Sequence, residues 1–329
     1  MDTTALPEPR PVDPADPVCP AALVLPAVAD PPLNERGPWL DRHEIVDAVT
    51  VPGLATPLYL TAEDVAVTTT SIGKSDAATT TTALLSTPAV DLRSAYIVSA
   101  GIGGAPPATA ALGSVALADA VVDWDRKHRW DRAGETGSGG LTPEEMSGAT
   151  DLDSDDRPID LLNYRPRDYV WQLDDRVVET AVDAAQEVAL GEDPVAKEYQ
   201  QTYPTAPASG PIVTTGTTVT GDEFWHGPRF AREVEWLCEQ YDVAPYTTTQ
   251  MEDVATVTAL ERFDRADRYL SIRAIANYDR SAPGESVEES FDGTEATLDL
   301  AIDNAERVGS AVVARLVADD PLEIADTGN

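Results

Sequence analysis

Two adjacent carboxylates open an apolar helical pattern in the second half of the chain. Glu252 and Asp253 follow Gln250 and Met251 and precede an apolar run at 254–260. A carboxylate offers two accepting oxygens, so Glu252 could accept hydrogen bonds from a pair of ligand hydroxyl groups. An acid in the first turn of a helix is more often only a partner of the helix dipole. The pair alone favours the structural role, and a nearby aromatic ligand-binding segment would favour the other.

An aromatic segment of this kind lies at 221–227, with the sequence GDEFWHG. Phe224, Trp225 and His226 stand between glycines, which is an unusual composition for a buried helix. An aromatic ring beside a cleft can stack on a planar base, so Phe224 is a candidate ligand contact. The alternative is that Phe224 and Trp225 are core residues at the entrance of the next helix.

Two polar residues follow a predicted strand at 269–276. Asn277 and Asp279 would stand at its carboxyl end. In open α/β sheets ligands bind at that edge, which makes both residues candidates for a site. The alternative is a simple turn, because Asn and Asp are common in turns.

A glycine cluster lies in the longest uncharged part of the chain. Residues 94–118 carry no charge, and Gly101, Gly103 and Gly104 lie near their middle. The run could span a membrane, but the Pro106–Pro107 pair would free backbone groups that lipid cannot satisfy. We therefore expect two buried strands, at 95–100 and 113–122, joined through a glycine-rich loop. The glycines would either shape a turn or let a ligand approach the backbone.

Other chemistries are not supported by the residues present. His43, His128 and His226 show no metal-ligand spacing, so no metal site is expected. Cys19 and Cys238 are far apart and form no CxxC pair, which disfavours a disulfide or a Cys-based site. Dinucleotide and P-loop glycine patterns and a serine nucleophile elbow are absent from the sequence. No cofactor is expected.

Strand and helix signals alternate along the chain, which predicts an α/β fold, a single domain with one central sheet flanked by helices. Strands are expected at 21–28, 45–51, 57–60, 65–70, 95–100, 113–122, 211–215 and 269–276. Helices are expected at 76–86 with Ser75 as the cap, and at 174–190, 227–241, 250–263 and 294–318. The domain would cover 21–319, with a disordered acidic and proline-rich tail at 1–20, an acidic surface insertion at 131–160 and a tail at 320–329.

The charge balance is strongly acidic. The chain of 329 residues has 58 Asp plus Glu against 23 Lys plus Arg, a formal net charge of −35. This disfavours nucleic acid and anionic membranes as partners and suggests a protein adapted to high salt, where charges are screened. The first residues lack the basic and apolar regions of a signal peptide, so we expect a cytoplasmic protein.

Several blocks, taken together in this order, resemble the purine nucleoside permease family, within the nucleoside phosphorylase superfamily. The blocks are SIGKSDAATTTTALL, YIVSAGIGGAPPATAALGSVALAD, GDEFWHG, MEDVATVTALERF and RAIANYDRSAPGE. The resemblance covers roughly residues 20–315 and leaves the acidic insertion outside. It implies a nucleoside phosphorylase-like fold with a mixed sheet, and a purine nucleoside as the ligand, with homo-oligomers being frequent among relatives.

The resemblance also implies roles for individual residues. Met251 would pack against a ribose, Glu252 would bind the ribose hydroxyls, and Phe224 would lie against the base or sugar. Asn277 would meet the purine where many relatives have Asp. The glycines at 101, 103 and 104 would approach the sugar and phosphate side. Glu252 and Asn277 would then be the catalytic pair, because an anion stabilises the oxocarbenium-like sugar and the departing purine needs a hydrogen bond or a proton.

Two departures bear on function. An Asn can only hydrogen-bond, which favours a 6-oxopurine or no turnover at all. Ile102 and Ser99 occupy the places where phosphorylases of this superfamily often have the Ser and Arg that hold phosphate, although backbone N–H groups could still bind it. We therefore expect purine nucleoside binding with cleavage of the N-glycosidic bond, phosphorolysis being slightly favoured over hydrolysis and phosphate being a possible co-substrate. The alternative is a binding or uptake component without turnover.

Overall fold

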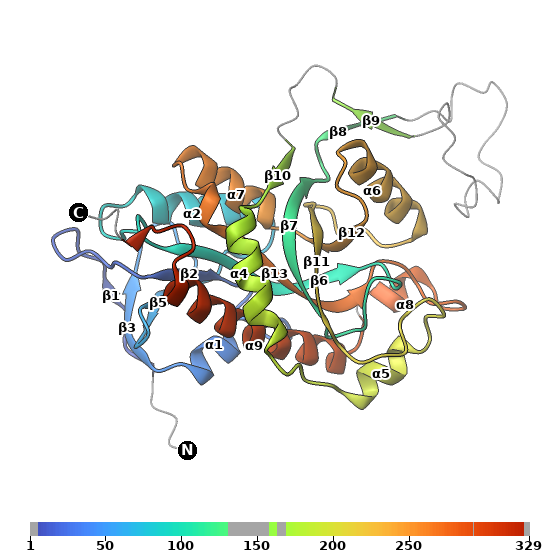
Figure 1. Ribbon diagram of the computed structural model, residues 1–329, viewed down its shortest axis with the longest axis horizontal. Coiled ribbons are helices and arrows are strands. Elements are labelled where there is room, and N and C mark those ends of the chain that lie inside the picture. The colour runs from blue at the N-terminus through green and yellow to red at the C-terminus, as the bar shows by residue number, and fades with distance from the viewer. Residues whose placement is uncertain (1–5, 131–157, 163–168, 292, 326–329) are drawn as a thin grey trace.

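The computed structural model describes residues 6–130, 158–162, 169–291 and 293–325. Figure 1 shows a large sheet with helices packed around it, so the predicted α/β class is confirmed. The large sheet has the order β1-β3-β4-β5-β2-β6-β12-β11-β7-β10, with β13 paired to both β6 and β7. Its strands are β1 (Arg10–Pro11), β2 (Ala22–Leu25), β3 (Ile45–Thr50), β4 (Leu58–Thr61), β5 (Val65–Val67), β6 (Tyr96–Ala105), β7 (Val115–Asp123), β10 (Val170–Gln172), β11 (Val213–Thr220), β12 (Tyr246–Gln250) and β13 (Tyr269–Tyr278). A small second sheet pairs β8 (Lys127–Arg129) with β9 (Ile159–Leu161).

The helices are α1 (Gly37–Arg42), α2 (Lys74–Ser86), α4 (Asp175–Gln186), α5 (Pro194–Gln200), α6 (Pro228–Gln240), α7 (Asp253–Arg262), α8 (Val287–Phe291) and α9 (Glu295–Asp319). A short 3-10 turn, Ala266–Arg268, precedes β13. The long helix α9 packs on β6 and β13, α4 lies beside it, and α2 packs against α7. The pairing is mixed: β13 is parallel to β6 but antiparallel to β7. Together β6, β12, β11, β7 and β13 close a ring of paired strands.

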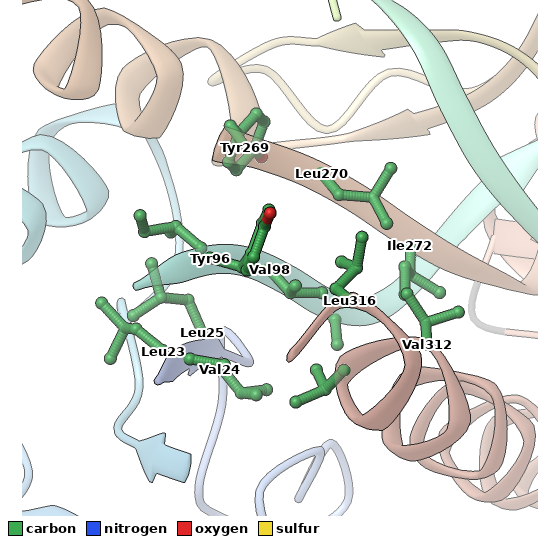
Figure 2. Packing of buried hydrophobic residues seen from close by; sticks show 14 of the residues in the cluster. Leu23, Val24, Leu25, Tyr96, Val98, Tyr269, Leu270, Ile272, Val312 and Leu316 are labelled. Atoms are coloured by element: carbon green, nitrogen blue, oxygen red, sulfur yellow. The ribbon is translucent and has the colours of Figure 1, made fainter. Parts of the chain in front are cut away.

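The core forms where α9 covers the central strands. Figure 2 shows Val98 on β6 and Ile272 on β13 beside Val312 and Leu316 of α9. A buried strand has no need for alternating polar residues, and β6 accordingly has none that is charged. The uncharged run at 94–118 therefore contributes two core strands, as expected.

No helix in the part of the chain that the structure describes is both long enough and apolar enough to cross a membrane.

The prediction of a glycine-rich loop at 101–104 is wrong, because these residues continue β6. Gly101, Gly103 and Gly104 pair with β13, and the register shifts at Gly103–Gly104. A Cβ on Gly103 would lie only 2.7 Å from the Thr249 carbonyl oxygen of β12. The role of Gly103 is thus to let the neighbouring strand β12 come close to the β6 backbone, and not to form a turn.

A second correction concerns the stretch before α7. Gln250 was expected in the helix, but it ends β12, and α7 begins at Asp253. Three consecutive threonines in β12 are β-branched and favour a strand. Similarly, α2 begins at Lys74 with Gly73, and not Ser75, at the N-cap position.

The expected tails also differ from the structure where they are described. Within 6–20, β1 pairs with β3 and Val18 is buried in the core. After α9, Ile324 is buried, and Asp320 accepts a hydrogen bond from the Tyr96 hydroxyl at 2.7 Å. Most of the predicted acidic insertion, residues 131–157, lies outside the described residues.

The contact of α1 with α9 gives a test of the packing. A Cβ at Gly309 of α9 would lie 2.7 Å from the buried Trp39 ring of α1. Gly309→Val should lower the free energy of unfolding by about 1–3 kcal/mol through overpacking. Ala314→Val places the same residue at an exposed position of the same helix and should cost only about 0.5 kcal/mol of helix propensity. Denaturant unfolding in high salt measures both, and equal losses would show that Trp39 does not restrict α9.

Candidate functional site

A pocket of about 540 Å³ opens beside the central strands. It lies where β6, β12 and β13 meet the segment after β2 and the aromatic segment before α6. Its lining includes Gly103, Gly104, Phe224, Met251, Glu252 and Asn277 of the predicted site. Gly101 does not line it. A Cβ on Gly101 would lie 2.5 Å from a carboxylate oxygen of Glu35, so this glycine instead makes room for an acid that does line the pocket.

Glu252 stands at the N-cap position of α7, but its side chain makes no capping hydrogen bond. The first backbone N–H groups of α7 are satisfied by the Gln250 side-chain oxygen, which accepts from Glu252 N at 2.8 Å and from Asp253 N at 2.9 Å. The Glu252 carboxylate instead accepts from Gly73 N–H at 3.1 Å, from Arg273 Nη1 at 3.3 Å and from Met251 N–H at 3.3 Å. The structural role that sequence favoured for this acid is therefore filled by Gln250, and the Glu252 carboxylate faces the pocket region.

Burial shapes the charge of Glu252. Loss of water raises the pKa of the carboxyl to about 7, although Arg273 and the Gly73 N–H oppose the rise, and Glu35 and Asp253 add to it. Such a group exchanges a proton near neutral pH, which is typical of functional carboxyls.

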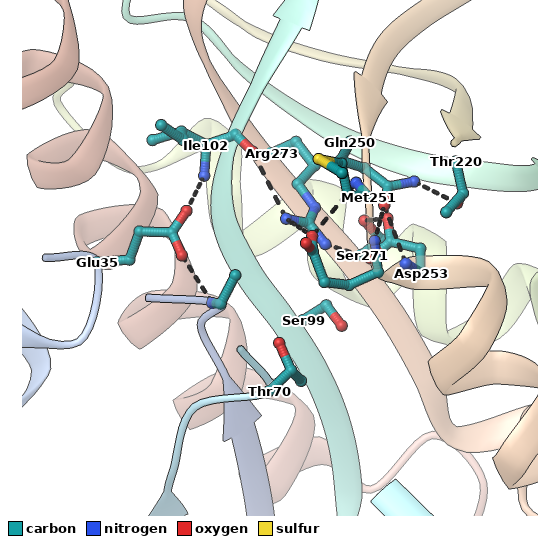
Figure 3. A network of polar contacts seen from close by, with 12 residues as sticks. Glu35, Thr70, Ser99, Ile102, Thr220, Gln250, Met251, Asp253, Ser271 and Arg273 are labelled. Atoms are coloured by element: carbon teal, nitrogen blue, oxygen red, sulfur yellow. Dashed lines mark hydrogen bonds and ion pairs between the residues drawn. The ribbon is translucent and has the colours of Figure 1, made fainter. Parts of the chain in front are cut away.

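Asp253 points the other way, into a buried network (Figure 3). Its Oδ1 accepts from the Tyr269 hydroxyl at 2.9 Å, its Oδ2 from the Ser271 hydroxyl at 2.5 Å, and it forms an ion pair with Arg273. The Tyr269 hydroxyl also lies 2.9 Å from Ser99 Oγ. Ser99 is thus part of this network and does not line the pocket.

Arg273 connects the network to the pocket. Its guanidinium is buried and lies between the Asp253 and Glu252 carboxylates. Among the described residues, Arg273 is the one Lys or Arg side chain that lines the pocket. Because two carboxylates already neutralise this charge, the pocket has little attraction left for an anion.

Glu35 is the main residue that sequence reasoning missed. It lies in the segment between β2 and α1 and lines the pocket, although it is almost fully buried. Its Oε2 accepts from Ala27 N–H at 2.6 Å and Val28 N–H at 3.0 Å, and its Oε1 from Ile102 N–H at 2.8 Å. Burial raises its pKa, against Arg273 and the three N–H donors. The available signal was that this acid follows the carboxyl end of the strand predicted at 21–28, the edge at which α/β sheets bind ligands.

The aromatic segment divides between the two expected roles. Phe224 is 64% exposed at the pocket rim and meets Phe291 of α8 edge to face at 5.8 Å. Trp225 lines the pocket but also packs on Trp124, as a core residue would. His226 is buried, and its Nε2 lies 2.7 Å from Ser290 Oγ of α8. Desolvation lowers the pKa of His226, which favours the neutral imidazole.

Asn277 and Asp279 both line the pocket, but they differ in how they are held. Asn277 donates from Nδ2 to the Phe291 carbonyl at 3.0 Å, which orients the amide and leaves a second N–H on the same nitrogen. The Asp279 carboxylate already accepts from the Tyr246 hydroxyl at 2.5 Å and from Arg280 Nε at 2.6 Å. Asn277 is therefore the more available of the two for a ligand.

No cluster of three potential metal ligands occurs within the described ranges. The polar side chains that line the pocket are carboxylates, two amides, a threonine hydroxyl, an imidazole and a neutralised guanidinium. Such a set can bind hydroxyl groups and a heterocycle, and it can exchange protons near neutral pH.

A family model and two relatives of known name point to the same protein family. A family model described as purine nucleoside permease matches residues 23–320. A probable purine nucleoside permease of Schizosaccharomyces pombe is 28% identical over 308 residues, which cover 86% of each chain. The purine nucleoside permease of Candida albicans is 26% identical over 303 residues, covering 86% of this chain and 72% of that one.

Solved structures share the fold. A 5'-methylthioadenosine/S-adenosylhomocysteine nucleosidase from Neisseria meningitidis superposes with a TM-score of 0.55 at 17% identity, covering 91% of this chain and 99% of that one. The futalosine hydrolase of Helicobacter pylori gives a TM-score of 0.54 at 16% identity, covering 89% and 97%. The predicted nucleoside phosphorylase-like fold is confirmed.

The raised pKa of Glu252 predicts a pH dependence of stability. The folded protein binds this proton more tightly than the unfolded chain does, so the associated stability is complete below about pH 4.5 and is lost as the pH rises through about 7. Glu252→Gln mimics the neutral form and should not show this loss. Relative to this variant, the wild type should lose on the order of 3 kcal/mol of unfolding free energy between pH 4.5 and 8.

Denaturant unfolding at several pH values tests this prediction. Glu261→Gln, at an exposed position of the same helix, should follow the wild type. Parallel pH curves for the wild type and Glu252→Gln would contradict it.

Proposed function

The chain belongs to the purine nucleoside permease family, and from this premise we propose that its pocket binds a purine nucleoside and hydrolyses the N-glycosidic bond. The observation that supports this best is the charge of the pocket. The buried carboxylates that line it are Glu35, Glu252 and Asp279, of which Asp279 is paired with Arg280, and the one guanidinium of the lining is already neutralised. Such a pocket suits an uncharged nucleoside and an uncharged acceptor.

The ribose would lie against Glu252 and Met251. The Glu252 carboxylate makes no capping hydrogen bond to α7, and its two oxygens have accepting capacity beyond the three donors Gly73 N–H, Met251 N–H and Arg273 Nη1. Two neighbouring hydroxyl groups match a carboxylate that can accept on both oxygens. As the bond to the base lengthens, the sugar becomes positively charged, and the same anion stabilises it.

The base would lie between Phe224 and Asn277. Phe224 offers an exposed ring face at the rim, and Asn277 retains an amide N–H after its bond to the Phe291 carbonyl. An amide cannot transfer a proton, so it can only hydrogen-bond to the departing purine. This favours a 6-oxopurine, whose ring carries the developing negative charge onto the oxo group, with the proton then taken from solvent.

Water is a better acceptor here than phosphate. The sequence resemblance slightly favoured phosphate, but the Ile102 N–H that could have bound it donates to Glu35. A phosphate would also bring negative charge beside Glu35 and Glu252. In the proposed reaction, the water oxygen bonds to the anomeric carbon, its proton passes to the Glu35 carboxylate, and the carbon–nitrogen bond breaks.

The second candidate is nucleoside binding without turnover, as a component of uptake. The observations that favour it are that the two fungal relatives are named as permeases, and that Asn277 cannot protonate a leaving group. Binding by Glu252 and Phe224 is common to both candidates, so only release of the base separates them.

A cleavage assay tests the proposal directly. Purified protein in high salt should release free base from inosine or guanosine without phosphate, and added phosphate should not increase the rate. A requirement for phosphate would replace hydrolysis by phosphorolysis. Tight binding without base release in either buffer would overturn the enzymatic proposal and leave the uptake component.

Substitution of Glu35 separates chemistry from binding. Glu35→Gln keeps the size of the side chain but removes the proton acceptor, so kcat should fall by about 10²–10⁴-fold while nucleoside affinity changes little. Glu223→Gln removes an exposed carboxylate at the pocket rim and should leave kcat within about twofold. Equal kcat values for the wild type and Glu35→Gln would exclude Glu35 as the base.

A further inference from the structure

Lys74, one of three lysines in the sequence, lies with its ammonium group between two carboxylates. It is the first residue of α2, and its Nζ lies 3.0 Å from Asp123 Oδ1 and 2.6 Å from Asp125 Oδ2, at the end of β7. Burial would lower the pKa of this ammonium, but Asp123 and Asp125 raise it above its ordinary value. Lys74 is therefore a charged, mostly buried link between a helix start and a strand end.

The backbone of the same turn reaches the pocket. Gly73 N–H donates to Glu252 Oε1 at 3.1 Å, and Lys74 N–H donates to Asp222 Oδ1 at 2.6 Å. Asp222 N–H in turn donates to Asp125 Oδ2 at 2.9 Å. Asp222 precedes Glu223 and Phe224, which line the pocket. One lysine thus connects the donor to Glu252 with the segment that presents Phe224.

The geometry suits an ammonium better than a guanidinium. The two carboxylates approach a single nitrogen within 3.0 Å, and a compact point charge can bind both at once. A planar guanidinium presents its donors in a wide fork and is longer. Most of the positive charge of this chain comes from Arg, so a Lys is uncommon at any position. At position 74 its single nitrogen fits between Asp123 and Asp125.

We propose that Lys74 is a positioning residue: its ion pairs with Asp123 and Asp125 hold the Gly73 N–H against Glu252 and the aromatic segment beside the same pocket. The choice of a nucleoside as the ligand rests on the proposed function, but the link from Lys74 to Glu252 does not. Glu252 is also faced by Arg273 of β13, by Glu35 after β2 and by Asp253 of α7. Lys74 contacts none of these three, so it acts on Glu252 through the turn.

Two variants distinguish positioning from simple charge. Lys74→Met removes both ion pairs but keeps a side chain of similar length. Asp123 retains its other ion pair, with Arg126 Nε at 3.3 Å. Loss of the Gly73 hydrogen bond should then raise the pKa of Glu252 by about one pH unit. Asp125→Ala removes a negative charge, which would lower the pKa of Glu252 through charge alone, but loosening of the turn should raise it. The opposite signs make Asp125→Ala the decisive variant.

The measurement does not depend on turnover. Infrared pH titration follows the carboxylic-acid band of Glu252, identified in each protein by its loss in a matching Glu252→Gln counterpart. Lys197→Met removes an exposed lysine whose nearest carboxylate, Glu192, is 3.9 Å away, and it should leave the band's midpoint unchanged. Inosine affinity, measured in parallel, should fall at least about tenfold in Lys74→Met and stay constant in Lys197→Met.

An unchanged Glu252 midpoint in folded Lys74→Met, or a lower midpoint in Asp125→Ala, would overturn the proposal. If Lys74→Met does not fold, the direction of the Asp125→Ala change decides by itself. If the wild type binds no inosine, the proposed function fails, while the infrared midpoints still decide the role of Lys74.

Discussion

The buried ion pairs of Arg273 determine the character of the whole site. A guanidinium without water is costly unless it is paired, and here Asp253 and Glu252 both pair with it. The Asp253 carboxylate also accepts hydrogen bonds from Tyr269 and Ser271, which lie on β13 as Arg273 does. These bonds fix the position of the carboxylate beside the guanidinium. Asp253 pairs with the Arg273 guanidinium on the side away from the pocket. The Glu252 carboxylate can therefore face the pocket and exchange a proton there. The negative balance of the pocket follows from this arrangement.

The glycines of β6 serve the same arrangement from the other side. Without side chains at 101 and 103, the strand leaves space for the Glu35 carboxylate and for the β12 backbone. Glu35 can then accept three backbone N–H groups and still line the pocket. Two carboxylates with raised pKa values thus lie in one cavity, each with its own set of donors, which is the condition for giving them different roles.

The sequence predicts the class of fold and most elements, because buried strands and amphipathic helices leave clear local patterns. Of the seven residues that it predicts for a ligand site, six line the pocket, and Gly101 does not. It fails where the cause is long-range. Nothing local shows that 101–104 remain in a strand, since the reason is the approach of β12. Glu35 has no motif around it, and its importance appears only when β2 and β6 are placed side by side.

The acidity of the surface and that of the pocket have different physical consequences. Salt screens exposed carboxylates over about 8–10 Å or less, so the large net charge becomes tolerable at high ionic strength. Glu35 and Glu252 are buried, and bulk salt screens them much less. A charged acceptor or a nucleotide would therefore meet repulsion in the pocket even where the surface field is suppressed. If the pocket works as proposed, a preference for uncharged ligands would arise from the buried carboxylates around Arg273, and it should persist at any salt concentration in which the protein is folded.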